Sequence, residues 1–352
     1  MKRQAFLLIL ALCAVMCAPK ESATLLVGTY SDGFFALDYN SGEVLAKAPM
    51  PNPSFLATSG PLIYAVSEMP DSSASVYAWR SGETSFELLG LQPTGIDGAR
   101  GEDPCYVATN GKILAVANYS GGTLALYPLN ADGSIAPLDS LVFSSTGGPD
   151  LSRQEKPHVH CAAFSPDGKH LFFSEFSADA IGSLDLVGTQ VRNYRKAAAL
   201  PADFGPRHLL FDSAGKHFYV IGELSGDIAV FDYEAGRLSP KQVVKADEVD
   251  ARGAADLHLS PDGRFLYASL RLRNDGIAVF SVADDGTLSK AGYLKTGPHP
   301  RNFAVTENQL IVACRDNDSI EIYPRDKQTG LPGPLARSLS VPKPVYVQLI
   351  EK

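Results

Sequence analysis

The chain lacks the short motifs that mark the commonest metal, nucleotide and serine-hydrolase sites. It contains no CxxC or HExxH pair and no acidic loop with the spacing of metal ligands. Walker-type glycine loops and the GxSxG motif are absent as well. The sequence therefore predicts neither a metal ion nor any other cofactor, and the candidate chemistry rests on ordinary side chains.

Positive charge is also in short supply. The sequence has 31 Lys and Arg against 39 Asp and Glu, which gives a formal net charge of −8 at pH 7. Nucleic acids and anionic membrane surfaces attract proteins with the opposite balance, so we expect no nucleic-acid partner. No run of like charges and no low-complexity linker divides the chain. We expect one large domain over residues 21–352, in a protein that is a monomer.

Cysteine is sparse and scattered. Cys13 and Cys17 lie in the N-terminal segment. The other three, Cys105, Cys161 and Cys314, fall in strand-like runs that are far apart in the chain. An odd number with this spread does not make a disulfide framework. We therefore predict that these three residues are buried free thiols.

Beyond the N-terminal segment, no stretch repeats its apolar residues with the period of a helix over ten or more residues. The chain instead repeats a unit of strands, which is clearest from Ala254 to Val282. The runs DLHL, FLYASL and IAVFSV have strand character and are separated by the turn signals SPDGR and NDG. TLSKAGYL follows as a fourth strand. The unit is therefore a four-stranded antiparallel meander of about 45 residues.

The second strand of this unit recurs in seven copies along the chain. They are LLVGTY, PLIYAVSE, KILAVANY, HLFFSEF, HFYVIGEL, FLYASLR and QLIVACR. Four strands in a repeat of about 40 to 50 residues are typical of a β-propeller blade. The sequence therefore predicts an all-β fold, a seven-bladed β-propeller of four-stranded antiparallel blades.

The two ends of the chain predict how the ring closes. The first copy, which begins at Leu25, has no first strand before it. The last copy is followed by its fourth strand, PLARSLSV, and then by one surplus strand, PVYVQLI (344–350). We expect the C-terminal strand to pair with the N-terminal blade as its innermost strand, because closure leaves no wide open sheet edge.

The N-terminal segment predicts export. Two basic residues precede an apolar run, residues 5–16, that is too short to span a membrane as a mature helix. Cys17 stands where a bacterial lipoprotein carries its lipid, although the residue before it is not the small one normally found there. We interpret residues 1–20 as a signal peptide and leave open lipidation of Cys17 or cleavage near Ala18. Either outcome places the mature protein in the periplasm or on the outer surface, and lipidation would anchor it to a membrane.

Polar side chains gather at one face of the predicted disc. First strands line the channel and second strands run antiparallel beside them, so first-strand starts and second-strand ends share that face. First-strand starts carry His158, His160, Arg207, His208, Asp256, His258, His299 and Arg301, and second-strand ends carry Glu68, Asn118, Tyr119, Glu175, Glu223, Arg271 and Arg315. Some of these groups would simply satisfy backbone in a wet channel. As a set, they resemble what acyl chemistry on an anionic substrate needs.

The blade motifs also resemble a known family. PHVHCAAFSPDGKHLFFSE, GPRHLLFDSAGKHFYVIGELSG, AADLHLSPDGRFLYASLR and GPHPRNFAV are similar to successive blades of the seven-bladed propeller lactonases. That family includes propeller-type 6-phosphogluconolactonase and the fungal carboxy-muconate cyclase, and the resemblance runs from about Leu25 to the C-terminus. It implies a catalytic set of one His, one Glu and two Arg, which by motif fall on His160, Glu223, Arg207 and Arg271.

The resemblance implies hydrolysis of a sugar-derived lactone, without a metal, by attack of water on the lactone carbonyl. His160 suits a general base near neutral pH, while Glu223 could orient that imidazole or be the base itself. The two arginines suit either the oxyanion or an anionic group on the substrate. The partner is a small-molecule lactone or anionic sugar acid. For its binding we predict His158, His208, Arg301, Asn118, Glu175 and His258.

Two alternatives stay open at this stage. The same site could form a lactone from a carboxylate, as a cycloisomerase of the muconate cyclase type. A propeller with a basic rim could also bind an anionic ligand or a protein without catalysis. The export signal adds a conflict, because propeller 6-phosphogluconolactonase acts on a sugar phosphate made inside the cell. Whether the substrate carries a phosphate is therefore open.

Overall fold

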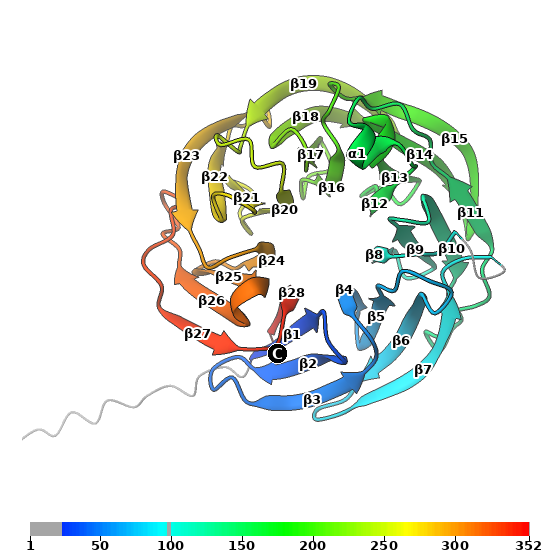
Figure 1. Ribbon diagram of the computed structural model, residues 1–352, viewed down its shortest axis with the longest axis horizontal. Helices are drawn as coiled ribbons and strands as arrows, with labels where there is room; N and C mark the ends of the chain where they lie inside the picture. The colour runs from blue at the N-terminus through cyan, green and yellow to red at the C-terminus, as the bar shows by residue number, and fades with distance from the viewer. Residues whose placement is uncertain (1–22, 97–99, 352) are drawn as a thin grey trace, which may run out of the picture.

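The structure is a computed structural model that describes residues 23–96 and 100–351. Seven four-stranded antiparallel sheets stand around a central channel (Figure 1). The predicted all-β, seven-bladed propeller is confirmed. The predictions made for the N-terminal segment, residues 1–20, lie outside the described residues.

We number the blades in chain order and give their strands from the channel outwards. Blade 1 contains β28 (Pro344–Glu351), β1 (Ala23–Thr29), β2 (Gly33–Asp38) and β3 (Val44–Pro49). Blade 2 contains β4 (Pro53–Ser59), β5 (Leu62–Ser67), β6 (Ser75–Ser81) and β7 (Phe86–Pro93). Blade 3 contains β8 (Pro104–Thr109), β9 (Ile113–Asn118), β10 (Thr123–Pro128) and β11 (Ser140–Phe143). Blade 4 contains β12 (Val159–Phe164), β13 (His170–Glu175), β14 (Ala180–Val187) and β15 (Gln190–Ala199).

Blade 5 contains β16 (Pro206–Phe211), β17 (His217–Gly222), β18 (Asp227–Glu234) and β19 (Arg237–Lys245). Blade 6 contains β20 (Ala254–Leu259), β21 (Phe265–Leu270), β22 (Gly276–Val282) and β23 (Leu288–Lys295). Blade 7 contains β24 (Pro300–Val305), β25 (Gln309–Cys314), β26 (Ser319–Pro324) and β27 (Arg337–Ser340). Three single helical turns complete the described chain: α1 (Leu151–Gln154), η1 (Phe176–Ala178) and η2 (Arg315–Asn317).

The ring closes as the sequence predicts. β28 pairs antiparallel with β1, from Ala23 opposite Glu351 to Thr29 opposite Pro344. The C-terminal strand is therefore the innermost strand of a blade whose other strands come from the N-terminal end of the described chain. This pairing covers the channel-side edge of β1, which would otherwise present unpaired N–H and C=O groups.

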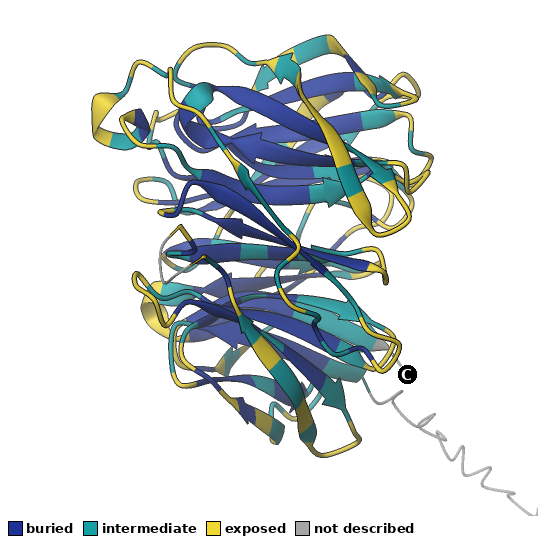
Figure 2. Cartoon of the chain, turned by 90° about the vertical axis from the view of Figure 1, so that its right-hand side faces the viewer, coloured by how far each residue is buried: buried dark blue, intermediate teal, exposed yellow. Residues whose placement is uncertain are grey.

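Burial follows the place of each strand in its blade. The second strands β9 and β21 are buried at every residue, as expected for strands with both faces packed. Side chains of neighbouring blades pack against each other, as Tyr219 and Ile221 of β17 do with Leu266 and Ala268 of β21. Figure 2 shows this buried interior between exposed loops and outer strands. Because the core lies between the blades, the ends of the inner strands are free to carry polar groups.

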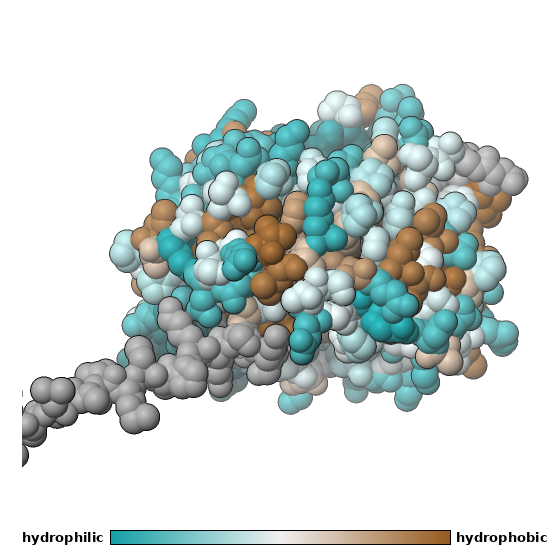
Figure 3. All heavy atoms as spheres, turned by 90° about the horizontal axis from the view of Figure 1, so that it is seen from below, coloured by the Kyte–Doolittle hydropathy of each residue, from teal (hydrophilic) through white to brown (hydrophobic). Residues whose placement is uncertain are grey.

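The rim of the disc is mostly hydrophilic. Figure 3 shows it from one side, with hydrophobic side chains in small separate groups. Exposed large hydrophobic residues on outer strands include Val44 of β3 and Leu88 and Leu91 of β7. In the part of the chain that the structure describes, no helix has the length and apolar character needed to cross a membrane. The polar side chains that the sequence singled out gather at the channel instead.

Candidate active site

One residue in each blade directly follows the second strand and stands at the same mouth of the channel. Its backbone N–H donates to a carbonyl oxygen that leads into the first strand, as Glu223 does to Gly205 and Arg271 to Gly253. The seven equivalent residues are Tyr30, Glu68, Tyr119, Phe176, Glu223, Arg271 and Arg315. The repeat therefore sets seven side chains around one opening, which we call the arginine mouth.

A bulge near the start of each first strand brings further side chains to this mouth. In β12, for example, the register with the second strand shifts between Val159 and Ala162. The first strands of the other six blades show a shift at the equivalent point. A bulge adds a residue to one strand and re-aims its side chain. The residues at these bulges include Cys105, His160 and Arg301.

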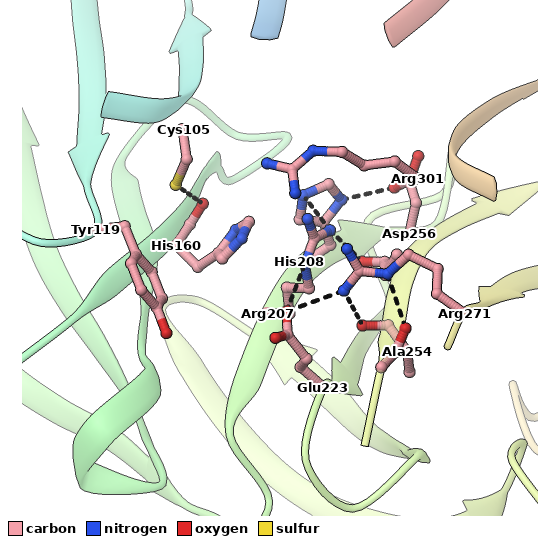
Figure 4. A network of polar contacts seen from close by, with 12 residues as sticks. Cys105, Tyr119, His160, Arg207, His208, Glu223, Ala254, Asp256, Arg271 and Arg301 are labelled. Atoms are coloured by element: carbon pink, nitrogen blue, oxygen red, sulfur yellow. Dashed lines mark hydrogen bonds and ion pairs between the residues drawn. The ribbon is translucent and has the colours of Figure 1, made fainter. Parts of the chain in front are cut away.

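The two sets of residues enclose a cavity of about 240 Å³. Its lining residues are Glu68, Cys105, Tyr119, Arg153, His160, Glu223, Arg271 and Arg301. Figure 4 shows the imidazole of His160, the phenol of Tyr119 and the guanidinium groups of Arg271 and Arg301 around a common space. The structure thus brings His160, Glu223 and Arg271 together in one cavity, whose wall does not include Arg207.

Glu223 is held by three arginines. Its Oε2 accepts from Nε of Arg207 at 2.9 Å and from Nη2 of Arg271 at 3.2 Å. Its Oε1 accepts from Nη2 of Arg153 at 2.7 Å. Burial alone would raise the pKa of the Glu223 carboxyl, but the arginine charges outweigh burial and lower it to about 2. A carboxylate of that pKa is a weak base, so Glu223 is suited to holding the cations in place.

His160 is buried and available as a base. The residue is 4% exposed, and its Nδ1 has no hydrogen-bond partner in the described part of the chain. Burial lowers the pKa of the His160 imidazole well below its usual range, and the charge of Arg207 acts in the same direction. The imidazole is therefore neutral at neutral pH. The imidazole lines the cavity, and in the described chain it makes no hydrogen bond to Glu223, which one reading of the sequence had allowed.

Arg207 stands behind the cavity. It is 1% exposed, and besides Glu223 it donates through Nη1 to the carbonyl oxygen of Ala255 at 2.5 Å and to Nε2 of His208 at 3.1 Å. Nδ1 of His208 in turn donates to Oδ1 of Asp256 at 2.6 Å. These contacts use the guanidinium group inside the protein. Arg207 and His208 therefore position Glu223 and do not reach a ligand in the cavity.

Arg301 takes the place in the cavity that the sequence had given to Arg207. Its Nη2 lies 3.5 Å from Oε2 of Glu68, and its guanidinium group lies 5.2 Å from the centre of the Tyr30 ring. The hydroxyl of Tyr30 donates to Oε1 of Glu68 at 2.8 Å. This looser setting leaves several N–H groups of Arg301 to face the cavity. Arg301 is thus better placed than Arg207 to meet a substrate.

The predictions for Asn118 and Glu175 are corrected by the register. Both are the last residues of their second strands and lie one residue before the ring position that Tyr119 and Phe176 occupy. Successive side chains of a strand point to opposite faces, so this offset turns them away from the mouth. Asn118 donates to the carbonyl oxygen of Thr94 at 2.8 Å. Glu175 instead accepts hydrogen bonds from two side chains of nearby loops and strands.

His258 was expected at the same face, and that placement is wrong. It lines a second, larger cavity of about 730 Å³, which we call the wide mouth. The wide mouth is formed by the other ends of the first strands, and it is lined by residues that include Phe55, Tyr106, Asn302 and Gln348. His258 lies two residues after Asp256 on β20 and donates to Oδ2 of that aspartate at 2.9 Å. His258 therefore lies far enough along β20 to reach the opposite mouth of the channel.

His158 lies beside the arginine mouth but outside the cavity wall. Its ring stacks on Tyr119 with centroids 4.1 Å apart, and its Nδ1 donates to the carbonyl oxygen of Tyr119 at 2.7 Å. It therefore supports a wall residue.

Sequence reasoning missed two residues of the cavity wall, Cys105, which it expected only as a buried thiol, and Arg153. Arg153 stands on α1, in the long connection from β11 to β12, where the four-strand repeat has no counterpart. The only signal in the sequence was the unusual length of that connection.

The three described cysteines are free and buried, as predicted. Sγ of Cys105, the one that lines the cavity, lies 3.4 Å from the carbonyl oxygen of His160. Burial raises the pKa of the Cys105 thiol well above its usual range, which makes it a poor nucleophile at neutral pH. Among residues 23–96 and 100–351, no group of three His, Cys, Asp or Glu side chains is placed to hold a metal ion.

Comparison with known proteins gives a consistent picture. Residues 24–349 match the family described as "Lactonase, 7-bladed beta-propeller". The chain is 30% identical to the 6-phosphogluconolactonase of Bacillus subtilis, over 93% of this chain and 98% of the relative. A Bacteroides uniformis structure, provisionally assigned as a 6-phosphogluconolactonase, superposes with a TM-score of 0.89 at 44% identity and covers 94% of this chain and all of its own. The periplasmic gluconolactonase of Pseudomonas aeruginosa superposes with a TM-score of 0.83 at 29% identity, covering 93% and 99%.

Proposed function

The chain belongs to the seven-bladed β-propeller lactonase family, and from that premise we propose that it hydrolyses a sugar-derived lactone in the cavity at the arginine mouth. It is a lactone hydrolase, a class of carboxylic ester hydrolase. The observation that carries the assignment of the site is the His160 imidazole, which lines a cavity bordered by guanidinium groups and accepts no hydrogen bond from the described chain at its Nδ1.

In the proposed reaction, His160 is the general base. A water oxygen forms a bond to the lactone carbonyl carbon while the neutral imidazole takes a proton from that water. The tetrahedral oxyanion then collapses, the bond between the carbonyl carbon and the ring oxygen breaks, and the imidazolium returns its proton to the ring oxygen. The product is the open hydroxy acid. Base catalysis of this kind is typically worth about 10²–10⁴ in rate.

The arginines stabilise the negative charge that develops on the carbonyl oxygen. Arg271 and Arg301 line the cavity and stay charged near neutral pH. Glu223 and Glu68 fix the two guanidinium groups, so little reorganisation is needed when the oxyanion forms. Arg207 contributes through Glu223, as a positioning residue.

The relatives guide the proposed substrate. Two of the compared proteins carry the name 6-phosphogluconolactonase, and one is named a periplasmic gluconolactonase. The shared chemistry is the lactone of a sugar acid, which we propose as the substrate class. Export of the mature chain also stays our prediction. Intact-mass analysis of the protein from its native cells tests it, and retention of Met1 in the cytosol would contradict it.

The activity is tested with purified protein and a panel of sugar and aromatic lactones. We expect turnover of at least one sugar lactone well above the spontaneous rate, unchanged after treatment with a chelator, since no step uses a metal. Absence of turnover on every lactone would reject the proposal and favour a binding propeller. Loss of turnover on chelation, restored by a metal, would reject the mechanism while keeping the activity.

A further inference from the structure

The connection from β11 to β12, residues 144–158, crosses the edge of the arginine mouth and carries α1. We call it the mouth loop. Arg153 is its contribution to the cavity wall. Nη2 of Arg153 donates both to Oε1 of Glu223 at 2.7 Å and to the hydroxyl of Tyr119 at 3.1 Å. Its guanidinium group also lies 5.3 Å from the centre of the Phe176 ring.

Arg153 differs from the other arginines around Glu223 in being accessible. Its side chain is 35% exposed, whereas those of Arg207 and Arg271 are 1% and 6% exposed. Both of its hydrogen bonds use Nη2. In the described chain, no protein atom accepts a hydrogen bond from its Nε or Nη1, so these N–H groups of an always charged side chain are available at the mouth.

Contacts on both sides of α1 hold the mouth loop, and with it the Arg153 side chain, in position. Gln154, which is buried, donates to Oδ1 of Asp179 at 2.8 Å and to the carbonyl oxygen of Phe176 at 3.1 Å. On the other side, Nη2 of Arg252 donates to Oδ2 of Asp150 at 2.6 Å.

The same Arg252 also pairs with Asp203, through Nη1 at 2.7 Å and Nη2 at 2.8 Å. Anchors on blade 4 and on the connections into blades 5 and 6 thus hold the four residues of α1.

The charge around the cavity favours an anion. Three guanidinium groups, those of Arg153, Arg271 and Arg301, line the cavity together with two carboxylates, those of Glu68 and Glu223. This local excess of positive charge contrasts with the net charge of −8 of the whole chain. Arg271 uses most of its donors within the protein, so Arg153 and Arg301 present the excess to the cavity, and Arg153 is the more exposed of the two.

We propose that the unpaired N–H groups of Arg153 form an anion-binding subsite, which holds a phosphate or carboxylate on the substrate at the end away from the lactone carbonyl. Each of these N–H groups can give a charge-assisted hydrogen bond to such a group. Arg252 is the positioning residue of the subsite. This inference rests on the proposed function, and it assigns the preference between charged and neutral sugar lactones to the mouth loop.

The test compares wild-type protein with Arg153→Ala on three sugar lactones. One is neutral, one carries a phosphate at the far end, and one carries a carboxylate there. Arg80→Ala is the matched control, since Arg80 is similarly exposed and is paired with Glu87. It lies in blade 2 opposite Leu62, the first residue of the second strand, and therefore at the end of the blade away from the arginine mouth. The readout is the ratio of kcat/KM for each charged lactone to that for the neutral one, with thermal melting to check the fold.

We expect wild-type protein and Arg80→Ala to prefer at least one charged lactone, and Arg153→Ala to lower that ratio by at least about tenfold, mainly through KM. The charged lactone whose kcat/KM ratio falls in Arg153→Ala identifies the anion that the subsite binds. Arg252→Ala should lower the same ratio by a smaller factor. A purely structural role would reduce all three lactones alike and leave the ratio unchanged, which would overturn the subsite.

Calorimetric binding of a phosphorylated sugar acid separates this inference from the proposed function, because it needs no turnover. Affinity that falls at least about tenfold in Arg153→Ala supports the subsite even if wild-type protein opens no lactone. Equal affinity of the two proteins, or no binding by either one, would overturn it.

Discussion

The two mouths of the channel are built from the same seven inner strands and differ in almost everything else. The wide mouth encloses about 730 Å³ and is lined mainly by aliphatic, aromatic and neutral polar side chains, and of its lining residues only His258 and Glu307 are of the Asp, Glu, His, Lys or Arg type. The arginine mouth encloses about 240 Å³ and is lined mostly by ionisable ones. The larger hollow is therefore not the better candidate for chemistry. Convergence of charged groups, with one unpartnered base, distinguishes the smaller one.

The repeat explains why the two ends differ. At the arginine mouth, each blade contributes a residue after its second strand and a residue re-aimed by a bulge. At the other mouth, the first strand runs directly into a tight turn such as SPDG, where Ser260 donates to Asp262 at 2.6 Å and Gly263 has φ of +71°. The side chains and glycines of these turns stabilise the hairpin. Each blade of this chain therefore contributes two side chains to one end of the channel.

The largest expected effect concerns the ion-pair network that only the arginine mouth has. Arg207→Ala should lower the free energy of unfolding by about 3 kcal/mol, because it leaves part of the buried charge of Glu223 unpaired. It should also reduce kcat, since Glu223 would hold Arg271 less firmly. Urea unfolding and steady-state rates measure the two effects. Gln348→Ala, in the wall of the wide mouth, is the control, and a similar loss in both variants would remove the distinction.

A smaller expected effect is on the pH dependence of kcat/KM, because the histidines at the two mouths have pKa values shifted in opposite directions. Burial lowers the pKa of His160, whereas at His258 the charge of Asp256 outweighs burial and raises it above its usual range of about 6.5. Only neutral His160 can accept a proton, so kcat/KM should stay level from pH 7 to 6 and decline only at more acid pH. The profile of His258→Ala should superimpose on it. A decline centred at or above pH 6.5 would show that another group is the base.

Much of the fold was predictable because the four-stranded unit occurs seven times in the sequence. The strand of FLYASL, the hairpin turn of SPDG and the pairing of the C-terminal strand with LLVGTY each follow from local patterns. The site was harder, because a bulge or a one-residue offset decides where a side chain points. Asn118 and Glu175 were placed one residue away from the ring position, and Arg207 and Arg301 differ in burial and in the partners of their guanidinium groups.

Two further features could not be read from periodicity at all. Arg153 lies in a connection that no other blade shares, so the repeat gives no register for it. His258 and Asp256 face the same channel two residues apart, and the depth at which a strand passes from one mouth to the other depends on the packing of seven strands. Sequence alone gave the list of polar residues, and the three-dimensional arrangement divided it between two cavities.

The central claim is that the chemistry belongs to the arginine mouth and depends on His160. The most direct test is the rate of lactone hydrolysis by His160→Ala and His258→Ala, two histidine variants at opposite ends of one channel, with wild-type folding confirmed by melting. We predict that His160→Ala lowers kcat by at least about a hundredfold, while His258→Ala changes it by less than about threefold. Near-normal hydrolysis by His160→Ala, or an equal loss in both variants, would contradict this account.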